Sequence, residues 1–313
     1  MSTPLVYVAL RQFCEEDDHP RRVLLNAGLE VRENTLGRRL RREEMATLLQ
    51  GANAVLAGVE PYDGELLAAL PRLRCISRCG AGTDSIDLEA ARQLGIAVYA
   101  TPEEVVEPVA QMTIAMMLAL ARQFPQHLAG CRSGLWKAQT GSLLSEWTVG
   151  LVGFGRIGRV VERYLRAFGS RVLVADPNVG RDAVPKPAEW RELPSLLAEA
   201  DLVSLHVGRP KDGGILMGRH EFAAMKQGSR LVNTARGYLV DEAALFDGLQ
   251  SGHLAGAALD VFADEPYTGR LATLPQVLCT PHVASLTRAS RAAMERRCAR
   301  NVLDWLARSR NGL

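Results

Sequence analysis

The sequence predicts an α/β fold of two doubly wound parallel-sheet domains with a cleft between them. The 313 residues are too many for one typical domain and suit two. Short apolar runs alternate with amphipathic segments, which is typical of βαβ units and a parallel sheet. Around residues 101–108 this alternation is interrupted by prolines and acidic residues, so we expect the chain to cross between domains there.

Four apolar runs in the first third predict strands at 5–9, 54–57, 75–78 and 97–99. Helices are expected between them, around 43–50, 64–70 and 87–94. Asp87 is a plausible N-cap for the last of these helices, and Gly95 a plausible C′ residue. This alternation indicates that the first part of one domain occupies residues 1–101.

A second βα series follows an Ala/Met/Leu-rich, buried helix expected at 109–123, with Pro108 in its first turn. Its expected strands are 148–152, 171–175, 202–205, 230–233, 257–260 and 277–279. Most are continuous apolar runs, as expected of parallel strands covered on both faces. We therefore expect a cofactor domain at 102–281, and a long helix at 286–308 that returns residues 282–313 to the first domain.

The composition excludes several classes of protein. With 47% hydrophobic and 23% charged residues and a net charge of +2, the chain has no charge pattern for nucleic acid. No apolar stretch is long enough to span a bilayer, and the N-terminus does not resemble a signal peptide. The six cysteines form no CxxC pair and no zinc-type spacing, so we expect no metal and a reducing cytoplasm.

The strongest local motif is a glycine loop between the strand at 148–152 and a helix expected at 159–168. Gly153, Gly155 and Gly158 form GxGxxG around Arg156 and Ile157, at the helix N-terminus where phosphates bind. Asp176 follows the next strand, 18 residues after Gly158. Its carboxylate can accept hydrogen bonds from ribose hydroxyls and repel a 2′-phosphate, which favours NAD over NADP, although Asp-Pro-Asn is also good turn chemistry.

Four further motifs follow later strands, at the edge where ligands gather in open α/β sheets. They are NTARG from Asn233, LDVF from Leu259, DEP from Asp264 and TPHVAS from Thr280. Together with GFGRIG, and in this order, they make almost the whole chain resemble the D-isomer-specific 2-hydroxyacid dehydrogenases. The resemblance implies a Rossmann cofactor domain, a flavodoxin-like substrate domain, NAD as the cofactor and a homodimer.

The resemblance also implies roles for residues in these motifs. His282 would exchange a proton with the substrate, since an imidazole titrates at about pH 6.5 and can work in both directions. Glu265 would hold the tautomer of His282, and Arg236 would grip a carboxylate and polarise the carbonyl. The cofactor would also contact His206, Thr234, Ala235 and Asp260. Asp260 as a strand-end cap and His206 as a structural residue remain open.

The substrate end of the site is expected on a loop after the strand at 75–78. Gly80, Ala81 and Gly82 suit a backbone nest for a carboxylate, and the resemblance adds Ser285. Arg78 resembles the arginine that helps phosphoglycerate dehydrogenases hold a distal phosphate, although an Arg at a strand end also reaches solvent without a ligand. The run after His282 is nearer to glyoxylate/hydroxypyruvate reductases.

These observations leave the physiological acid open. Two other interpretations also remain: a non-catalytic NAD-sensing protein like the corepressors that share this fold, and a formate dehydrogenase. Glu265 disfavours the latter, in which Gln commonly stands beside the histidine.

Overall fold

The computed structural model describes residues 3–208 and 213–310. The chain divides into two compact units: unit 1 comprises Met1–Val105 with Ser285–Leu313, and unit 2 comprises Val106–Ala284. The expected boundaries, after residues 101 and 281, lie a few residues before the observed ones, which follow Val105 and Ala284. The outermost ends of the expected ranges, at 1–2 and 311–313, lie outside the described residues.

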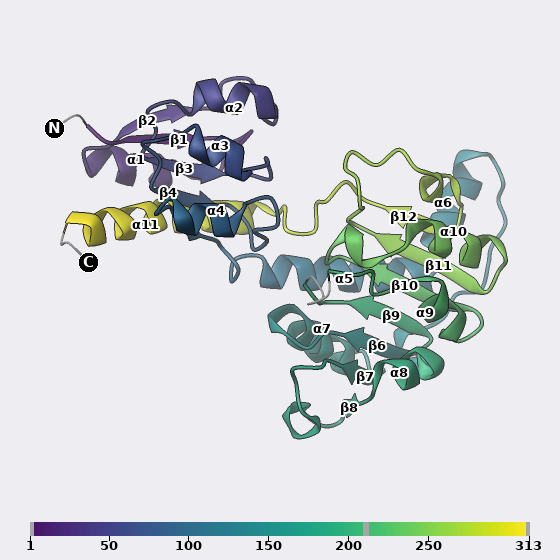
Figure 1. Cartoon of the computed structure of the whole chain (residues 1–313). Helices are drawn as coiled ribbons and strands as arrows, with labels where there is room; N and C mark the ends of the chain where they lie inside the picture. The colour runs from purple at the N-terminus through teal and green to yellow at the C-terminus, as the bar shows by residue number, and fades with distance from the viewer. Residues whose placement is uncertain (1–2, 209–212, 311–313) are drawn as a thin grey trace. The chain divides into compact units, whose positions relative to one another are not determined.

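Unit 1 is built on a parallel five-stranded sheet of order β2-β1-β3-β4-β5 (Figure 1). This is the flavodoxin-like order, as expected. The strands are β1 (Leu5–Val8), β2 (Glu30–Glu33), β3 (Ala54–Ala57), β4 (Cys75–Arg78) and β5 (Ala97–Tyr99). Its helices are α1 (His19–Asn26), α2 (Arg42–Leu48), α3 (Gly64–Ala68), α4 (Leu88–Gln93) and α11 (Arg288–Arg310).

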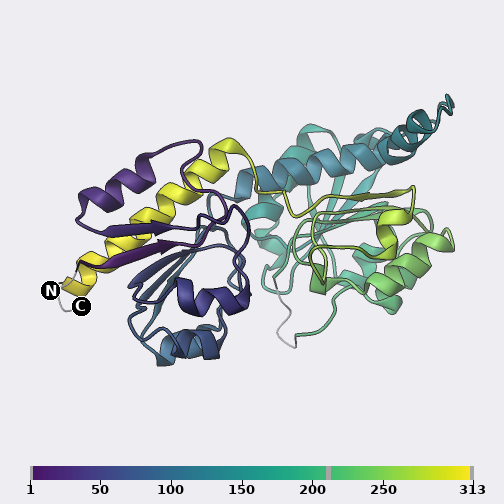
Figure 2. The ribbon, with the colours of Figure 1, turned by 90° about the horizontal axis from the view of Figure 1, so that it is seen from above.

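The two faces of this sheet are covered by different helices. Helices α1 and α11, purple and yellow in Figure 2, lie together on one face. Leucines and Met45 from α2 and α3 pack on the other face against Tyr7, Val55 and Ile76. Asp87 caps α4 as expected, because its side chain accepts a hydrogen bond from Ala90 N–H, and Gly95 follows with φ +68°. Both faces are therefore buried, which explains the continuous apolar strands.

Unit 2 contains a parallel seven-stranded sheet of order β12-β11-β10-β9-β6-β7-β8 (Figure 1). The strands are β6 (Thr148–Val152), β7 (Arg171–Ala175), β8 (Glu189–Trp190), β9 (Leu202–Leu205), β10 (Ser229–Asn233), β11 (Leu254–Leu259) and β12 (Val277–Cys279). The helices are α5 (Val106–Ala121), α6 (Phe124–Arg132), α7 (Arg156–Ala167), α8 (Leu193–Glu199), α9 (Arg219–Ala224) and α10 (Glu242–Gln250).

The strand order of unit 2 places a topological switch point at β6. Strand β6 pairs with β7 on one side and with β9 on the other, so the chain direction across the sheet reverses there. Helices α5 and α7 pack on one face, and α8, α9 and α10 pack on the other. The carboxyl ends of all seven strands lie at one edge, and ligands of open α/β sheets bind beside such a switch point.

The sequence did not predict β2, β8 or helices α1, α6, α8, α9 and α10. Strand β2 is an edge strand whose residues alternate between exposed and half-buried, so it carries no apolar run. None of the helices of the described residues is long and apolar enough to cross a membrane.

Candidate active site

The glycine loop of unit 2 joins β6 to α7 and has the shape that a dinucleotide requires. A Cβ on Gly153, which has φ +101°, would lie 2.5 Å from the backbone oxygen of His206. A Cβ on Gly158 would lie 2.4 Å from the backbone oxygen of Gly153. Gly155 faces open space, with nothing within 4 Å of the corresponding position. Two glycines thus allow tight packing, and the middle one leaves room for a pyrophosphate.

Helix α7 supplies the groups that would bind that pyrophosphate. Gly155 is its N-cap residue and makes no side-chain capping bond, and Arg156 and Ile157 form its first turn. The first N–H groups of an α-helix have no partner within the helix, and they carry the positive end of its dipole. The loop and helix therefore fit the phosphates of NAD.

Asp176 follows β7 and is tied to the glycine loop. Its Oδ2 accepts a hydrogen bond of 2.8 Å from Phe154 N–H, inside the loop, and its Oδ1 accepts one of 2.8 Å from Asn178 N–H. The carboxylate is thus both a turn former and a neighbour of the loop, so the two interpretations of Asp176 are compatible. Each oxygen retains a further lone pair for a ribose hydroxyl.

His206 follows β9 and lies against the same loop. Its Nε2 is 3.0 Å from Ser204 Oγ, and its Cβ would be 3.7 Å from a Cβ on Gly158. Burial lowers the pKa of His206 to about 4, so its imidazole is neutral near pH 7. This geometry gives His206 a structural role in packing the loop, whether or not it also contacts a cofactor.

The loop after β10 carries Arg236 and is organised by Asn233. Asn233 accepts a hydrogen bond of 3.0 Å from Ala235 N–H and donates one of 2.9 Å to the backbone oxygen of Arg236. Thr234 Oγ1 lies 2.9 Å from Thr113 Oγ1 of α5. The half-buried Arg236 donates through Nη1 to the backbone oxygen of Ala235 at 2.7 Å. Thr234 and Ala235, the two residues before Arg236, are thus held by hydrogen bonds to other residues of unit 2.

Gly237 brings the Arg236 loop against the loop after β11. A Cβ on Gly237 would lie 1.8 Å from the carbonyl carbon of Phe262 and 2.3 Å from Ala263 N. No side chain fits such a backbone contact, so the position requires glycine. The glycine of NTARG therefore holds two of the loops at this edge together.

Asp260, directly after β11, organises the loop that carries His282. The Asp260 side chain is fully buried. Its Oδ1 accepts hydrogen bonds from Thr280 Oγ1 at 2.5 Å and from Val283 N–H at 2.9 Å, and its Oδ2 accepts one from Ala284 N–H at 2.8 Å. The backbone oxygen of Asp260 accepts from His282 N–H at 2.9 Å. Four bonds from 280–284 thus converge on this residue, as its interpretation as a strand-end cap predicts.

His282 and Glu265 form a direct pair at this edge. The Nδ1 atom of His282 is 2.9 Å from Glu265 Oε2 and 3.1 Å from Oε1. A carboxylate can only accept a hydrogen bond, so Nδ1 carries the proton and Nε2 is the basic nitrogen. His282 has φ +56°, a strained value for a non-glycine residue, and the Asp260 bonds hold it there. Glu265 Oε1 also accepts from Phe262 N–H at 3.2 Å.

The loop after β4 in unit 1 differs in one respect from the expected anion nest. Gly80 has φ +135°, but its N–H donates to Thr101 Oγ1 at 2.7 Å, so it is not available for a carboxylate. Within the described residues, the N–H groups of Ala81 and Gly82 form no hydrogen bond. These two N–H groups are therefore the part of the expected nest that is available to a carboxylate. Ser285, at the start of the C-terminal part of unit 1, is half-buried.

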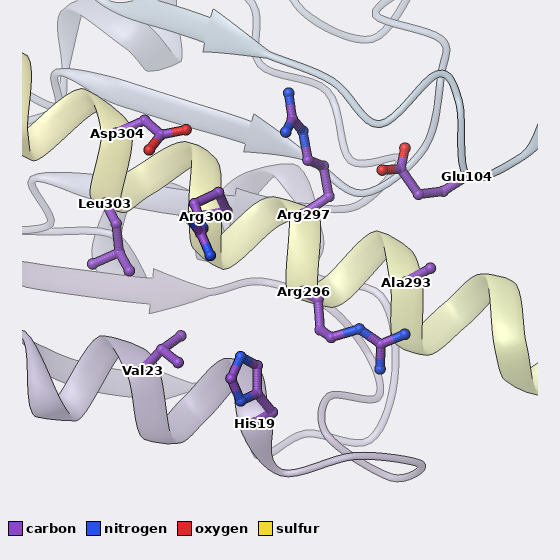
Figure 3. Close-up of a pocket in the computed structure, with 9 residues that line it drawn as sticks. All are labelled: His19, Val23, Glu104, Ala293, Arg296, Arg297, Arg300, Leu303 and Asp304. Atoms are coloured by element: carbon purple, nitrogen blue, oxygen red, sulfur yellow. The ribbon is translucent and has the colours of Figure 1, made fainter.

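A hollow of about 450 Å³ lies elsewhere on unit 1, along α11 (Figure 3). It is lined by side chains of α1 and α11, including His19, Arg296 and Arg300, and by Glu104. None of the expected site residues lines it. In the part of the chain that the structure describes, no group of three or more His, Cys, Asp or Glu side chains could hold a metal.

Sequence reasoning missed the residues that position this site. Asn233 and Gly237 lie inside a motif from which only Thr234, Ala235 and Arg236 were predicted as site residues, and Thr280 inside one from which only His282 and Ser285 were predicted. Their positions at the carboxyl ends of strands were available as a signal, since loop-forming polar residues and glycine there organise neighbouring loops. The bonds of Asp260 to residues about twenty positions away leave no local pattern.

The site and the fold together define a two-unit α/β protein with a dinucleotide loop and a His–Glu pair at the same sheet edge. Residues 114–284 match the model of the D-isomer specific 2-hydroxyacid dehydrogenase NAD-binding domain. The chain is 38% identical over 251 residues to D-3-phosphoglycerate dehydrogenase of Mycobacterium bovis, covering 79% of this chain and 48% of the relative. It is 35% identical over 302 residues to glyoxylate reductase of Thermococcus kodakarensis, covering 93% and 85%.

A similar solved structure is that of the TT0316 protein from Thermus thermophilus. It is 37% identical, covers 96% of each chain and superposes with a TM-score of 0.86. The chain therefore belongs to the D-isomer specific 2-hydroxyacid dehydrogenase family, and its unit 2 contains the NAD-binding domain of that family. The chain spans about half the length of the phosphoglycerate dehydrogenases it matches.

Proposed function

We propose that the protein transfers hydride reversibly between NAD and a small 2-hydroxy or 2-oxo acid. The observation that carries the proposal is the His282–Glu265 pair at 2.9 Å, at the same sheet edge as the dinucleotide loop. Relatives named as a phosphoglycerate dehydrogenase and a glyoxylate reductase support the same class of reaction.

Three side chains carry the chemistry in this proposal. NAD, when bound, supplies the hydride acceptor. His282 Nε2 takes the proton from the substrate hydroxyl during oxidation and returns it during reduction. Glu265 holds the ring through Nδ1 and stabilises the imidazolium that forms. Arg236 binds the carboxylate of the acid and polarises its carbonyl oxygen.

We propose further contacts for the cofactor along the sheet edge. Gly153, Gly155, Arg156, Ile157 and Gly158 bind the phosphates. Asp176 accepts from the ribose hydroxyls and repels a 2′-phosphate, which supports NAD rather than NADP.

Nearer the nicotinamide we assign His206, Thr234, Ala235 and Asp260. The buried hydrogen bonds of Asp260 support an indirect role, in which it positions the loop of His282.

On unit 1 we propose that the N–H groups of Ala81 and Gly82 bind a carboxylate oxygen of the acid, with Gly80 supplying the turn. Arg78 and Ser285 are assigned to the substrate as well. Arg78 supports an activity like that of phosphoglycerate dehydrogenase, and the alternative is a glyoxylate/hydroxypyruvate reductase.

The proposal is tested by NADH oxidation with a panel of 2-oxo acids: glyoxylate, hydroxypyruvate, phosphohydroxypyruvate, pyruvate and longer acids. We expect turnover on at least one, with NADH preferred to NADPH. An Asp176→Ala variant should lose most of this preference, because the repulsion of the 2′-phosphate is removed. If NADH binds and no 2-oxo acid is reduced, the protein is a binding protein and the proposal is wrong.

We also propose that the protein is a homodimer assembled through unit 2. Helix α6 and the segment after it expose large apolar side chains, and Trp136 is 92% exposed. The others are Phe124, Leu128, Leu135 and Leu143. An apolar set of this size on one segment is typical of a protein interface. Light scattering should give the mass of a dimer, and Trp136→Ser should weaken it; a monomeric wild type would contradict the proposal.

We propose a cytoplasmic location. Cys79 and Cys298 are buried next to each other as thiols, and the other cysteines are free as well. Adjacent thiols that are not oxidised suit a reducing compartment. Mass measurement of protein alkylated directly in cell lysate should find both thiols unbridged; a Cys79–Cys298 disulfide there would contradict the proposal.

A further inference from the structure

Helix α5 buries a hydroxyl that its packing does not require. Thr113 is fully buried, and the other buried residues of α5 are proline, valine, alanine, isoleucine, methionine and leucine. The helix packs with Val232 of β10 and Ala258 of β11 in one apolar cluster. A valine would fill nearly the same volume without a polar atom, and a buried hydroxyl is unfavourable unless it is hydrogen-bonded. The presence of a threonine therefore has to be explained by what its hydroxyl binds.

The two contacts of this hydroxyl fix the direction of a neighbouring one. Thr113 Oγ1 donates to the backbone oxygen of Val109 at 2.8 Å, and it lies 2.9 Å from Thr234 Oγ1. A hydroxyl has a single proton, and a backbone oxygen can only accept. Because the proton of Thr113 goes to Val109, the proton of Thr234 makes the bond between the two hydroxyls. Thr234 Oγ1 is then left with lone pairs and has no proton for another partner.

Thr234 lies at the edge of the sheet to which the cofactor is assigned. It directly follows β10, which pairs with β9, and β9 pairs with β6 at the switch point. Thr234 is buried, and within the described residues its Oγ1 makes no hydrogen bond except the one with Thr113. A buried acceptor of this kind suits a ligand group that donates. The nicotinamide end of the proposed cofactor carries such a group, the NH₂ of its carboxamide.

We propose that Thr113 is a positioning residue for the cofactor, which binds the hydroxyl proton of Thr234 so that Thr234 Oγ1 can only accept from the carboxamide NH₂ of the nicotinamide. The inference rests on the proposed function. Without the hydroxyl of Thr113, the hydroxyl of Thr234 can turn and donate, and it then suits the carbonyl oxygen of the carboxamide as well as the NH₂ group. Thr113 thus selects one of the two orientations of the carboxamide, and it does so through Thr234.

The test compares NADH with reduced 3-acetylpyridine adenine dinucleotide, and the Kd of each is measured by isothermal titration calorimetry. In this analogue an acetyl group replaces the carboxamide, so the NH₂ donor is missing and the carbonyl oxygen remains. Thr113→Val, which is nearly isosteric, should weaken NADH binding about fivefold, the contribution of one neutral hydrogen bond, and should not weaken binding of the analogue. Thr113→Ser keeps the hydroxyl and should keep the wild-type ratio of the two Kd values.

The matched control is Ser170→Ala, which removes another buried hydroxyl of unit 2. Ser170 lies directly before β7, at the opposite edge of the sheet, and its Oγ donates to the backbone oxygen of Leu144 at 2.8 Å. Both Ser170→Ala and Thr113→Val should lower the melting temperature, because each leaves a buried polar group without its partner. Only Thr113→Val should change the ratio of the two Kd values.

Three outcomes contradict the inference. An unchanged Kd for NADH in Thr113→Val shows that the proton of Thr234 does not matter to the cofactor. An equal weakening of both ligands in Thr113→Val shows a merely structural role. A ratio that changes as much in Thr113→Ser as in Thr113→Val shows that the hydroxyl is not responsible. Because the readout is binding, a protein that binds NADH and reduces no 2-oxo acid fails the proposed function and leaves this inference standing, whereas a wild type that does not bind NADH overturns both.

Discussion

Substituting Asp260 by Asn tests how the histidine loop is held. In the Asp260→Asn variant, the side-chain carbonyl oxygen can still accept from Thr280 and Val283 at the Oδ1 position. The amide NH₂ then replaces Oδ2, the atom to which Ala284 N–H donates in the wild type. Two donors would face each other in a fully buried place. We expect the loop to shift and the His282–Glu265 pair to loosen.

The magnitude follows from the bonds that change. One hydrogen bond to a charged group is lost, and such bonds contribute about 1.5–3 kcal/mol. A buried donor is also left unsatisfied, which costs about 1–3 kcal/mol. The two terms overlap, because both describe the bond at Ala284, so we expect unit 2 to lose about 2–4 kcal/mol of unfolding free energy. The matched control is Asp264→Asn on the same connection, where the side chain is exposed and the change should stay within about 0.5 kcal/mol.

Urea unfolding followed by tryptophan fluorescence measures this effect. Three of the four tryptophans, Trp136, Trp147 and Trp190, lie in unit 2, so the signal reports mainly on that unit. The reasoning is refuted if Asp260→Asn unfolds at the same urea concentration as the control. It is also refuted if Asp260→Asn is destabilised while NADH-dependent turnover remains at the wild-type level.

Three further predictions concern the same sheet edge. Gly155→Ala should keep the wild-type melting temperature, because the new Cβ meets nothing within 4 Å, and it should weaken NADH binding in a fluorescence titration. Gly158→Ala should instead lower the melting temperature, because its Cβ would lie 2.4 Å from the backbone oxygen of Gly153. Glu265→Gln should lower kcat about tenfold. This is the lower end of the range for a hydrogen bond to a charged group, because both side chains of the His282–Glu265 pair are partly exposed. An unchanged kcat would argue against a role for this carboxylate. The pKa of His206 is lowered to about 4, so the fold opposes its protonation. The stability that the neutral imidazole confers is present above about pH 6.5 and is lost as the pH falls toward 4. Over that pH range the urea midpoint of His206→Gln should therefore fall less than that of the wild type. Equal falls in the two proteins would contradict a buried neutral His206.

Much of the fold could be predicted because strands buried on both faces form continuous apolar runs. All ten strands expected from such runs are present, with ends that shift by a few residues. The glycine spacing predicted the turn from β6 to α7, since each glycine there meets a different steric demand. Edge strand β2 escaped prediction because half of its residues face solvent.

The parts of the site that could not be predicted depend on contacts between distant segments. Gly237 is required by the backbone of Phe262, and nothing in its own neighbourhood indicates that contact. Gly80 was expected to bind an anion, but its N–H is used by Thr101, which is brought there only by the pairing of β4 and β5.

The central claim is that His282 moves the proton in a hydride-transfer reaction. The most direct test is single-turnover reduction of the best 2-oxo acid by NADH in the His282→Ala variant, with NADH binding measured by fluorescence on the same sample. We expect binding close to wild type and a turnover rate lower by about 10²–10⁴, the usual contribution of a general acid–base. A variant that binds NADH and turns over at the wild-type rate would contradict the claim.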